Sequence, residues 1–196
     1  MVTSPGWDGY TALGATSVSV TMLLAVGVVM SWSTGREFID GTVVGLFAIP
    51  SRLGILAAAK MAVVLTWATI LGAVEAGALT TAGLLLGLGP EGAAGCCTTL
   101  MLVAALLGAS VLPVMWAATR WRGYLAGIGL TLVILVVANL AAGFGLGSYV
   151  PWSIPIVWVS HQTEVSTPLL ATPVMTAAIG AWVTLRSWDR LQLGAD

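Results

Sequence analysis

Residues 33–60 read STGREFIDGTVVGLFAIPSRLGILAAAK and lie between two apolar runs, each long enough to cross a bilayer. We call residues 33–60 the charged segment. It holds five of the fifteen charged residues of the chain: Arg36, Glu37, Asp40, Arg52 and Lys60. A group of charges between two such runs predicts a structured element at the membrane surface, joining the ends of two spanning helices.

The charged segment is expected to form two helices joined by an elbow. Thr34 followed by Glu37 has capping-box spacing, in which the hydroxyl accepts from one backbone N–H and the carboxylate from the other. A helix should therefore start there, with a charged side and an apolar side that lies in the membrane interface. Pro50 ends it. Ser51 then caps a second helix that begins at Arg52 and runs into the next span.

Composition places the chain among integral membrane proteins. Of its 196 residues, 58% are hydrophobic and only 8% are charged, and the mean hydropathy is +1.00. Soluble domains have roughly a quarter of their residues charged. We expect an all-α single transmembrane domain with no separate soluble domain. The net charge of −1 argues against a nucleic-acid partner.

Five apolar runs are expected to span the bilayer. They cover residues 11–32, 61–88, 98–119, 123–146 and 169–185. The first run has no basic residue before it, so we expect an uncleaved helix rather than a signal peptide. Three GxxxG pairs mark candidate close helix contacts: Gly83 with Gly87, Gly123 with Gly127, and Gly143 with Gly147.

Residues 147–168, before the last run, are too apolar for a solvated loop, while Pro151 and Pro155 prevent one long helix. A re-entrant segment on the outer side is the preferred interpretation, and an amphipathic loop lying on the headgroups is the alternative.

The basic residues give the orientation. With the N-terminus outside, all seven Lys and Arg fall on the inner side and the C-terminus is cytoplasmic. Tryptophans near both boundaries fit the aromatic belts of a membrane protein. They are Trp7, Trp152 and Trp158 outside, and Trp32, Trp116, Trp121, Trp182 and Trp188 inside.

The charged segment also contains a pattern of residues, E-x3-GT-x7-PSR-x7-K, which runs from Glu37 to Lys60. It resembles the cytoplasmic coupling helix of ABC-2 type permeases, the membrane subunits of bacterial ABC exporters. Family members usually have six spans, against five here, and one more residue between the proline and the Ser-Arg pair. The resemblance implies that the charged segment contacts an ATPase. The residues to which it assigns this role are Arg36, Glu37, Asp40, Gly41, Thr42, Pro50, Ser51, Arg52 and Lys60.

The resemblance further implies a bacterial plasma-membrane exporter built from two permeases, identical or different, and two ABC ATPase subunits that bind ATP and Mg. Within the charged segment, Glu37 and Arg52 are expected to hold the elbow together or to contact the ATPase. The alternative is that these charges only anchor the segment at lipid headgroups.

Polar residues inside the spans are candidates for a substrate path. Glu75 lies in the middle of the second run, where a bare carboxylate costs at least ~2.5 kcal/mol. It is expected to face protein or water, either in a polar cavity or as a protonated side chain bonded to a neighbouring helix. Asn139 fits a hydrogen bond between helices better. His161, the only histidine, is expected in the outer loop.

The sequence lacks the motifs that several enzyme functions require. The sequence has no GxxxxGK[ST], HExxH or GxSxG, so neither ATP hydrolysis nor an intramembrane protease is expected of this chain. The adjacent Cys96 and Cys97 fit small residues at a helix start, and no metal site or bound cofactor is expected. We predict an exporter subunit for an amphipathic or hydrophobic drug, lipid or peptide. The alternative is a non-transporting scaffold or immunity protein that binds a cytoplasmic partner.

Overall fold

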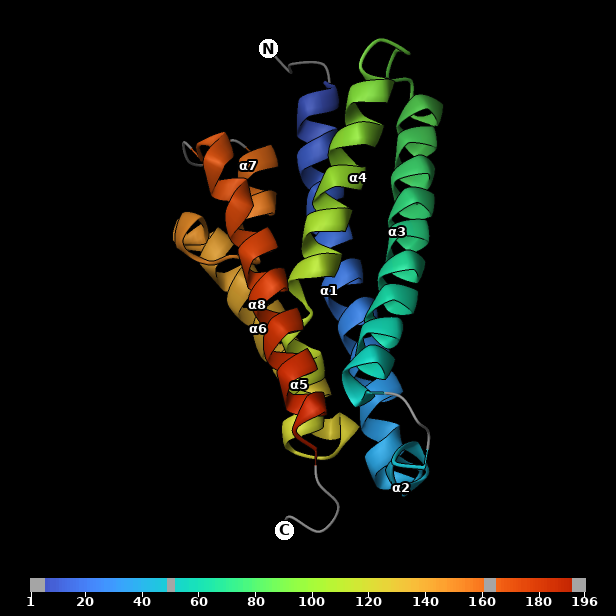
Figure 1. Ribbon diagram of the computed structural model, residues 1–196. Coiled ribbons are helices and arrows are strands. Elements are labelled where there is room, and N and C mark those ends of the chain that lie inside the picture. Colours follow the sequence, from blue (N-terminus) through green and yellow to red (C-terminus); the bar gives the residue numbers. More distant parts are fainter. Residues whose placement is uncertain (1–5, 49–51, 161–164, 192–196) are drawn as a thin grey trace.

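The computed structural model describes residues 6–48, 52–160 and 165–191. It is an elongated helical bundle, with the first described residues at one end and the last at the other (Figure 1). Within the described residues there are no strands, and five helical stretches are long and apolar enough to cross a membrane. They are Trp7–Ile39, Leu53–Leu85, Ala93–Arg120, Tyr124–Gly143 and Thr167–Asp189. The predicted all-α membrane fold with five spans is confirmed.

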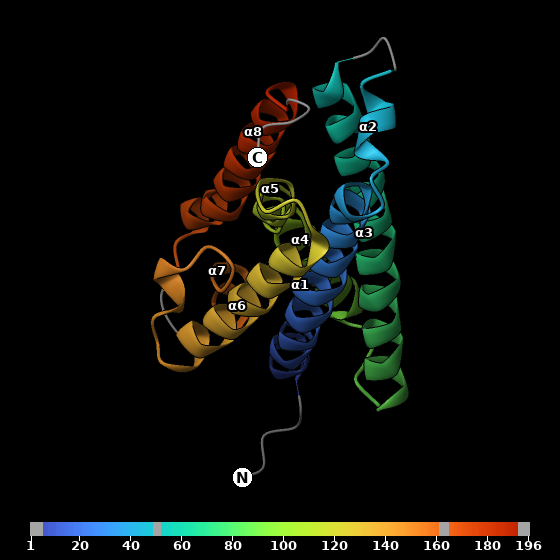
Figure 2. The same ribbon diagram turned by 90° about the horizontal axis from the view of Figure 1, so that it is seen from below.

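Helix α1 (Trp7–Ile39) lies in the middle of the bundle. It packs against α3 (Leu53–Leu85), α4 (Ala93–Ser110), α5 (Pro113–Arg120), α6 (Tyr124–Gly143) and α7 (Ile154–Ser160). Figure 2 shows α3 on one side of it and α6 on the other. Its buried face repeats every three to four residues, as a packed helix requires. That face includes Ala15, Val18, Met22, Val26 and Met30.

Small residues let α1 and α6 approach closely. A Cβ added at Gly127 would meet the Ser31 hydroxyl at 2.5 Å, and one at Gly27 would meet that of Thr131 at the same distance. Of the predicted GxxxG pairs, Gly83, Gly127 and Gly147 face other residues too closely for a Cβ. Gly87 and Gly143 face open space, and Gly123 has room for a Cβ, so each pair supplies one close contact rather than two.

The third predicted span is broken within the membrane. Helix α4 ends at Ser110, and Pro113 occupies the first turn of α5. Proline lacks the N–H that a continuous helix would need and favours a first-turn position. Gly180 of α8 (Ala171–Asp189) packs against the Pro113 ring. The single helix expected over residues 98–119 is therefore two, and the break is where α8 crosses.

The segment before α8 folds into the bundle. It contains a 3-10 turn, η1 (Gly147–Tyr149), then α7, then a second 3-10 turn, η2 (Thr167–Leu170). The side chains from Ile154 to Val157 are buried, and the Trp152 Nε1 donates to the Ser110 carbonyl at 3.0 Å. These buried contacts support the re-entrant interpretation over a loop on the headgroups. His161 lies outside the described residues.

Figure 1 shows the end of α1, the start of α3 and the ends of α5 and α8 at one end of the bundle. All seven basic residues belong to these helix ends or to the residues next to them: Arg36, Arg52, Lys60, Arg120, Arg122, Arg186 and Arg190. Asp8 and Glu91 lie at the opposite end. The separation is what the predicted orientation requires, and which end faces the cytoplasm stays a prediction. Following that prediction, we call the basic end the inner end and the opposite end the outer end. One tryptophan departs from the predicted belt. Trp188 is fully buried between helices, because its ring nitrogen has a partner there.

The orientation leads to a labelling prediction. In a background carrying Cys96→Ala and Cys97→Ala, Glu91→Cys should react with a membrane-impermeant maleimide in intact cells. Arg190→Cys should react only after the cells are permeabilised, since basic ends of spans stay inside. Labelling of Arg190→Cys in intact cells would reverse the topology.

Candidate functional site

No new helix starts at Thr34, where the sequence predicted one. Thr34 does not cap a new helix, because α1 continues without a break to Ile39. A Cβ at Gly35 would collide with the backbone of Gly123 and Tyr124, so this turn of α1 packs tightly on the start of α6. That tertiary contact keeps the turn helical. The Thr34 hydroxyl is buried and finds no hydrogen-bond partner in the described structure.

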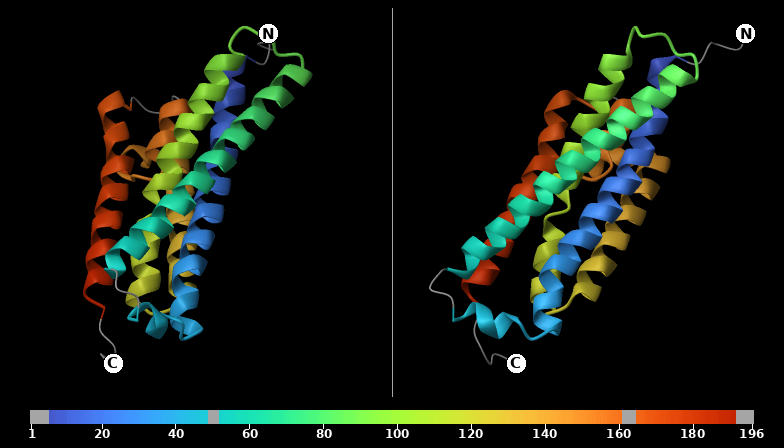
Figure 3. Two further views of the ribbon diagram at one scale, coloured as in Figure 1. Left: turned by 45° about the vertical axis from the view of Figure 1, so that its right-hand side comes forward. Right: turned by 90° about the vertical axis from the view of Figure 1, so that its right-hand side faces the viewer.

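The connection between α1 and α3 contains fewer helical residues than predicted. Asp40 ends α1, and Gly41 adopts a positive φ of 70°, which turns the chain. Only α2 (Val43–Leu46) is helical in the described part of the connection, and none of its residues is buried. The expected long amphipathic helix is wrong here, since the glycine turn breaks it after Asp40. Figure 3 shows α2 at the inner end, in the connection from α1 to α3.

Pro50 and Ser51 lie outside the described residues, so their roles in the elbow stay predictions. The second helix of the charged segment, α3, begins at Leu53, one residue later than predicted, so Arg52 takes the N-cap position that was predicted for Ser51. The Arg52 side chain makes no capping hydrogen bond.

An ion pair joins α1 to α3 within the charged segment. The Lys60 Nζ of α3 lies 2.7 Å from the Glu37 Oε1 of α1, and it donates to the Ser33 carbonyl at 2.7 Å. The two side chains are 24% and 17% exposed, so the pair is largely shielded from water. Low exposure strengthens the attraction and also makes loss of one partner costly.

Of the two residues expected to hold the elbow together or to contact the ATPase, Glu37 forms an ion pair with Lys60. Arg52 is exposed and forms no ion pair with any described residue. The other Glu37 oxygen, Oε2, is buried and unpartnered within the described structure.

Arg36 and Asp40 form a second, weaker pair at the surface. The Arg36 Nε lies 3.9 Å from the Asp40 Oδ2, and the two side chains are about half exposed. The Arg36 guanidinium also lies over the Trp32 ring, 4.6 Å from its centroid. Thr42 donates to the Glu37 carbonyl at 3.4 Å. Arg36 and Asp40, together with α2, form the exposed part of the charged segment.

A cluster at the end of α8, which the sequence analysis did not find, connects the charged segment to the rest of the bundle. The Trp188 Nε1 donates to the Thr119 hydroxyl of α5 at 2.9 Å. The Trp188 ring packs edge-on against Phe38 of α1, with centroids 6.3 Å apart. The only sequence signal was an aromatic residue followed by an acid at a span end, and the tryptophan fitted a belt position equally well.

Asp189 supplies the cap that Arg52 does not. Its Oδ1 accepts the backbone N–H of Gly54, in the first turn of α3, at 3.1 Å. A carboxylate there satisfies one of the free N–H groups and favours the positive end of the helix dipole. The end of α8 thus holds both the end of α1 and the start of α3.

Glu75 and Asn139, the polar residues predicted inside the spans, have different kinds of hydrogen-bond partner. Glu75 is partly buried on α3, with Thr21 of α1 as a hydrogen-bond partner. Its Oε2 has no partner within the described residues. Asn139 was expected to bond a neighbouring helix, but its Nδ2 donates to the Leu135 carbonyl of its own helix at 2.8 Å.

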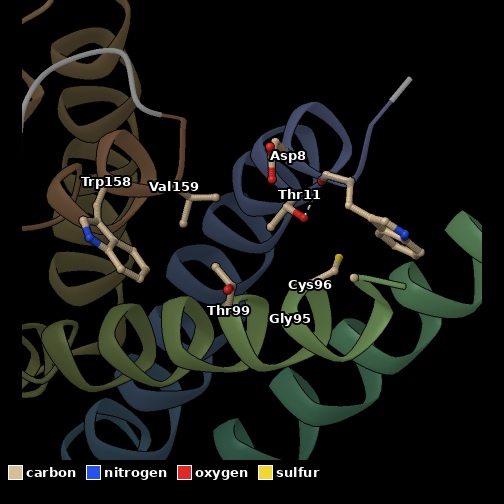
Figure 4. A pocket seen from close by; sticks show the side chains of 9 residues that line it. Asp8, Thr11, Gly95, Cys96, Thr99, Trp158 and Val159 are labelled. Atoms are coloured by element: carbon tan, nitrogen blue, oxygen red, sulfur yellow. Dashed lines mark hydrogen bonds between the residues drawn. The ribbon is translucent and has the colours of Figure 1, made fainter. Parts of the chain in front are cut away.

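A cavity of about 350 Å³ opens at the outer end, opposite the charged segment. Figure 4 shows Asp8 and Thr11 of α1, Cys96 and Thr99 of α4, and Trp158 and Val159 of α7 around it. Trp7, Gly92 and Gly95 complete its lining. The described residues contain no group of three or more His, Cys, Asp or Glu that could hold a metal ion.

The geometry at the inner end, two spanning helices joined by a short exposed helix and a shielded ion pair, fits the resemblance found in the sequence. Residues 3–138 match the ABC-2 family transporter proteins, and this range covers the whole charged segment. The chain belongs to the ABC-2 family. No curated protein matches the chain, and no solved structure matches it. As an ABC-2 protein it is a multi-pass membrane subunit of a transporter, in a family that pairs with an ABC ATPase.

The shielding of the Lys60 pair predicts a measurable coupling energy. In a double-mutant cycle, Glu37→Gln and Lys60→Met should show a coupling of about 1 to 2 kcal/mol in unfolding of the purified protein, between the values for exposed and buried pairs. The matched control is Arg36→Gln with Asp40→Asn, where exposure should keep the coupling below about 0.5 kcal/mol. Equal couplings in the two cycles would show that the Lys60 pair does not fasten the helices.

Proposed function

We propose that this ABC-2 protein is the membrane subunit of an ATP-driven exporter, and that its partner ATPase docks on α2 and the adjoining ends of α1 and α3. The observation that carries the proposal is the arrangement at the inner end. Helix α2 has no buried residue and exposes Val44 and Gly45, and it lies between two spanning helices whose ends are joined by the ion pair of Glu37 and Lys60. A surface built this way fits a partner protein better than it fits the bundle itself.

The proposed docking surface comprises Arg36, Asp40, Gly41, Thr42 and Arg52, with α2 between them. The surface carries both positive and negative charges. Complementary charges on a partner would fix how the partner is oriented and would disfavour wrong partners. Lys60 and Glu37 lie behind this surface and keep α1 and α3 moving together. Because Pro50 and Ser51 connect α2 to α3, they belong to the same proposed element.

Movement of the docked surface would reach the whole bundle through the cluster at the end of α8. Phe38 contacts Trp188, Trp188 bonds Thr119 of α5, and Asp189 bonds the start of α3. A shift of α2 therefore acts on α1, α3, α5 and α8 together. Coupling through packed and hydrogen-bonded elements of this kind requires two arrangements of the same contacts. ATP binding at the partner would select between them.

The substrate path is proposed to run past Glu75, between this chain and a second permease subunit, identical or different. Glu75 Oε2 has no partner within the described chain, and an unpaired carboxylate oxygen in a membrane favours a polar cavity. Asn139, whose amide bonds its own helix, is a weaker candidate. The proposed cargo is an amphipathic or hydrophobic molecule, the proposed location is the bacterial plasma membrane, and ATP and Mg bind the partner.

The experiment measures coupling without a known substrate. The chain is reconstituted with the ABC ATPase that co-purifies with it, and spin labels at Leu86 and Tyr149 report distances at the outer end. In the wild type, ATP with vanadate should shift the distance distribution. In the double variant Glu37→Ala, Arg52→Ala, we expect either loss of the ATPase during purification or continued hydrolysis without the shift, because removal of Glu37 frees the inner end of α1.

Glu91→Ala is the control, since it removes a charge at the opposite end and should leave both readouts unchanged. A normal ATP-dependent shift in the double variant would contradict the coupling role. Correct membrane insertion of every variant is checked by the maleimide labelling described above.

A further inference from the structure

Helix α8 carries a continuous groove on its side facing α5. The groove has a volume of about 370 Å³ and an almost wholly apolar lining. It is lined by Pro113, Trp116, Thr176, Ile179, Gly180 and Val183. Its depth comes from the break between α4 and α5 and from the missing side chain at Gly180, which lets α8 cross over Pro113.

The groove leads into a basic hollow at the inner end of α8. This second space, of about 220 Å³, shares Val183 with the groove and also contains Trp182, Arg186, Ser187 and Arg190. Thr176, Val183 and Arg190 are seven residues apart along α8, so they follow one side of the helix. The apolar groove and the basic hollow are therefore two parts of one site.

The charges in the hollow favour an anion. Arg186 and Arg190 are exposed, and the Arg186 guanidinium lies over the Trp182 ring, 5.3 Å from its centroid. Asp189 is the nearby acid along α8, but its Oδ1 accepts the Gly54 N–H at the start of α3. The Ser187 hydroxyl donates to the Val183 carbonyl. The guanidinium groups of Arg186 and Arg190 can therefore donate hydrogen bonds to an anion, while the adjacent Asp189 carboxylate accepts the Gly54 N–H.

The length of the site matches one leaflet of a bilayer. Thr176 and Arg186 are ten residues apart, which is about 15 Å along a helix. The hydrocarbon of a single leaflet has about the same thickness, half of roughly 30 Å. A lipid whose headgroup meets the arginines would lay an acyl chain along the groove as far as Thr176. Trp182 lies beside the hollow, at the depth where indole rings favour the interface.

We propose that this site binds one anionic phospholipid of the inner leaflet, its phosphate held by Arg186 and Arg190 and an acyl chain in the groove between α5 and α8. Basic pockets between spanning helices on the cytoplasmic side recognise anionic headgroups in this way. The bound lipid would fill the gap beside Pro113 and hold α8 against α5, close to the cluster formed by Trp188. The proposal does not depend on transport and stands apart from the proposed function.

The test is native mass spectrometry of the full chain in detergent, equilibrated with an equimolar mixture of phosphatidylglycerol and phosphatidylcholine. The wild type should retain phosphatidylglycerol preferentially. The double variant Arg186→Gln, Arg190→Gln should weaken its binding roughly 30-fold, at the usual contribution of each basic residue. The control Arg36→Gln, Arg52→Gln makes the same charge change at the same end, outside the groove, and should leave binding within about threefold of the wild type.

A second variant tests the groove rather than the charges. Val183→Phe adds bulk where the groove meets the hollow, and it should reduce retention of both lipids. Equal retention of the two lipids by the wild type, or equal losses in the two double variants, would overturn the proposal. So would a disulfide-linked dimer of the Val183→Cys chain in the cysteine-free background, which would place a second copy in the groove.

Discussion

The fold depends on how closely other helices can approach α1. Lipid surrounds the bundle, so burial of apolar side chains gives little drive for one helix to choose another, and close packing has to supply it. Gly27, Gly35 and Gly127 bring α6 against α1 at distances that leave no room for a Cβ on either side of the contact. A helix held in this way has little freedom to bend. Under the proposed function, a displacement of its inner end would be transmitted along its length.

Among the described residues, the ion pair that joins two spanning helices lies at the inner end, together with two further polar contacts between helices. The Glu37 and Lys60 side chains pair where the packed helices shield them from most of the solvent. Asp189 completes the N-terminus of α3, and the Trp188 indole finds the Thr119 hydroxyl. Each contact joins different helices, so the charged segment is fastened to α1, α3, α5 and α8. The outer end has a cavity lined by α1, α4 and α7, beside which Trp7 donates to the Gly89 carbonyl and Tyr10 to the Leu79 carbonyl.

The sequence was sufficient for the features that depend on composition. Apolar runs gave the five spans, and the distribution of Lys and Arg matched the one basic end of the bundle. It was insufficient where tertiary contacts override a local signal. Thr34 and Glu37 have capping-box spacing, yet α1 continues through them because Gly35 packs on α6. Helical periodicity after Asp40 suggested a long interfacial helix, but the positive φ of Gly41 turns the chain and only α2 follows.

The partners of charged residues were harder to predict than their positions. Glu37 and Arg52 were expected to hold the elbow together or to contact the ATPase. In the structure Glu37 pairs with Lys60, since only the fold determines which cation comes within reach. The cap of α3 comes from Asp189, 135 residues away. No local pattern in the sequence reports such a contact. The resemblance to ABC-2 permeases nevertheless identified the right family, because residues 3–138 match it.

The most direct test of the coupling account is photo-crosslinking in living cells from a photoreactive amino acid placed at Val44, an exposed residue of α2. The account predicts a covalent product between this chain and a protein with the phosphate-binding motif of an ABC ATPase, identified by mass spectrometry. The same amino acid at Leu86, at the opposite end of the bundle, should give no such product. Absence of an ATPase adduct at Val44, in cells where both proteins are present, would contradict the central claim.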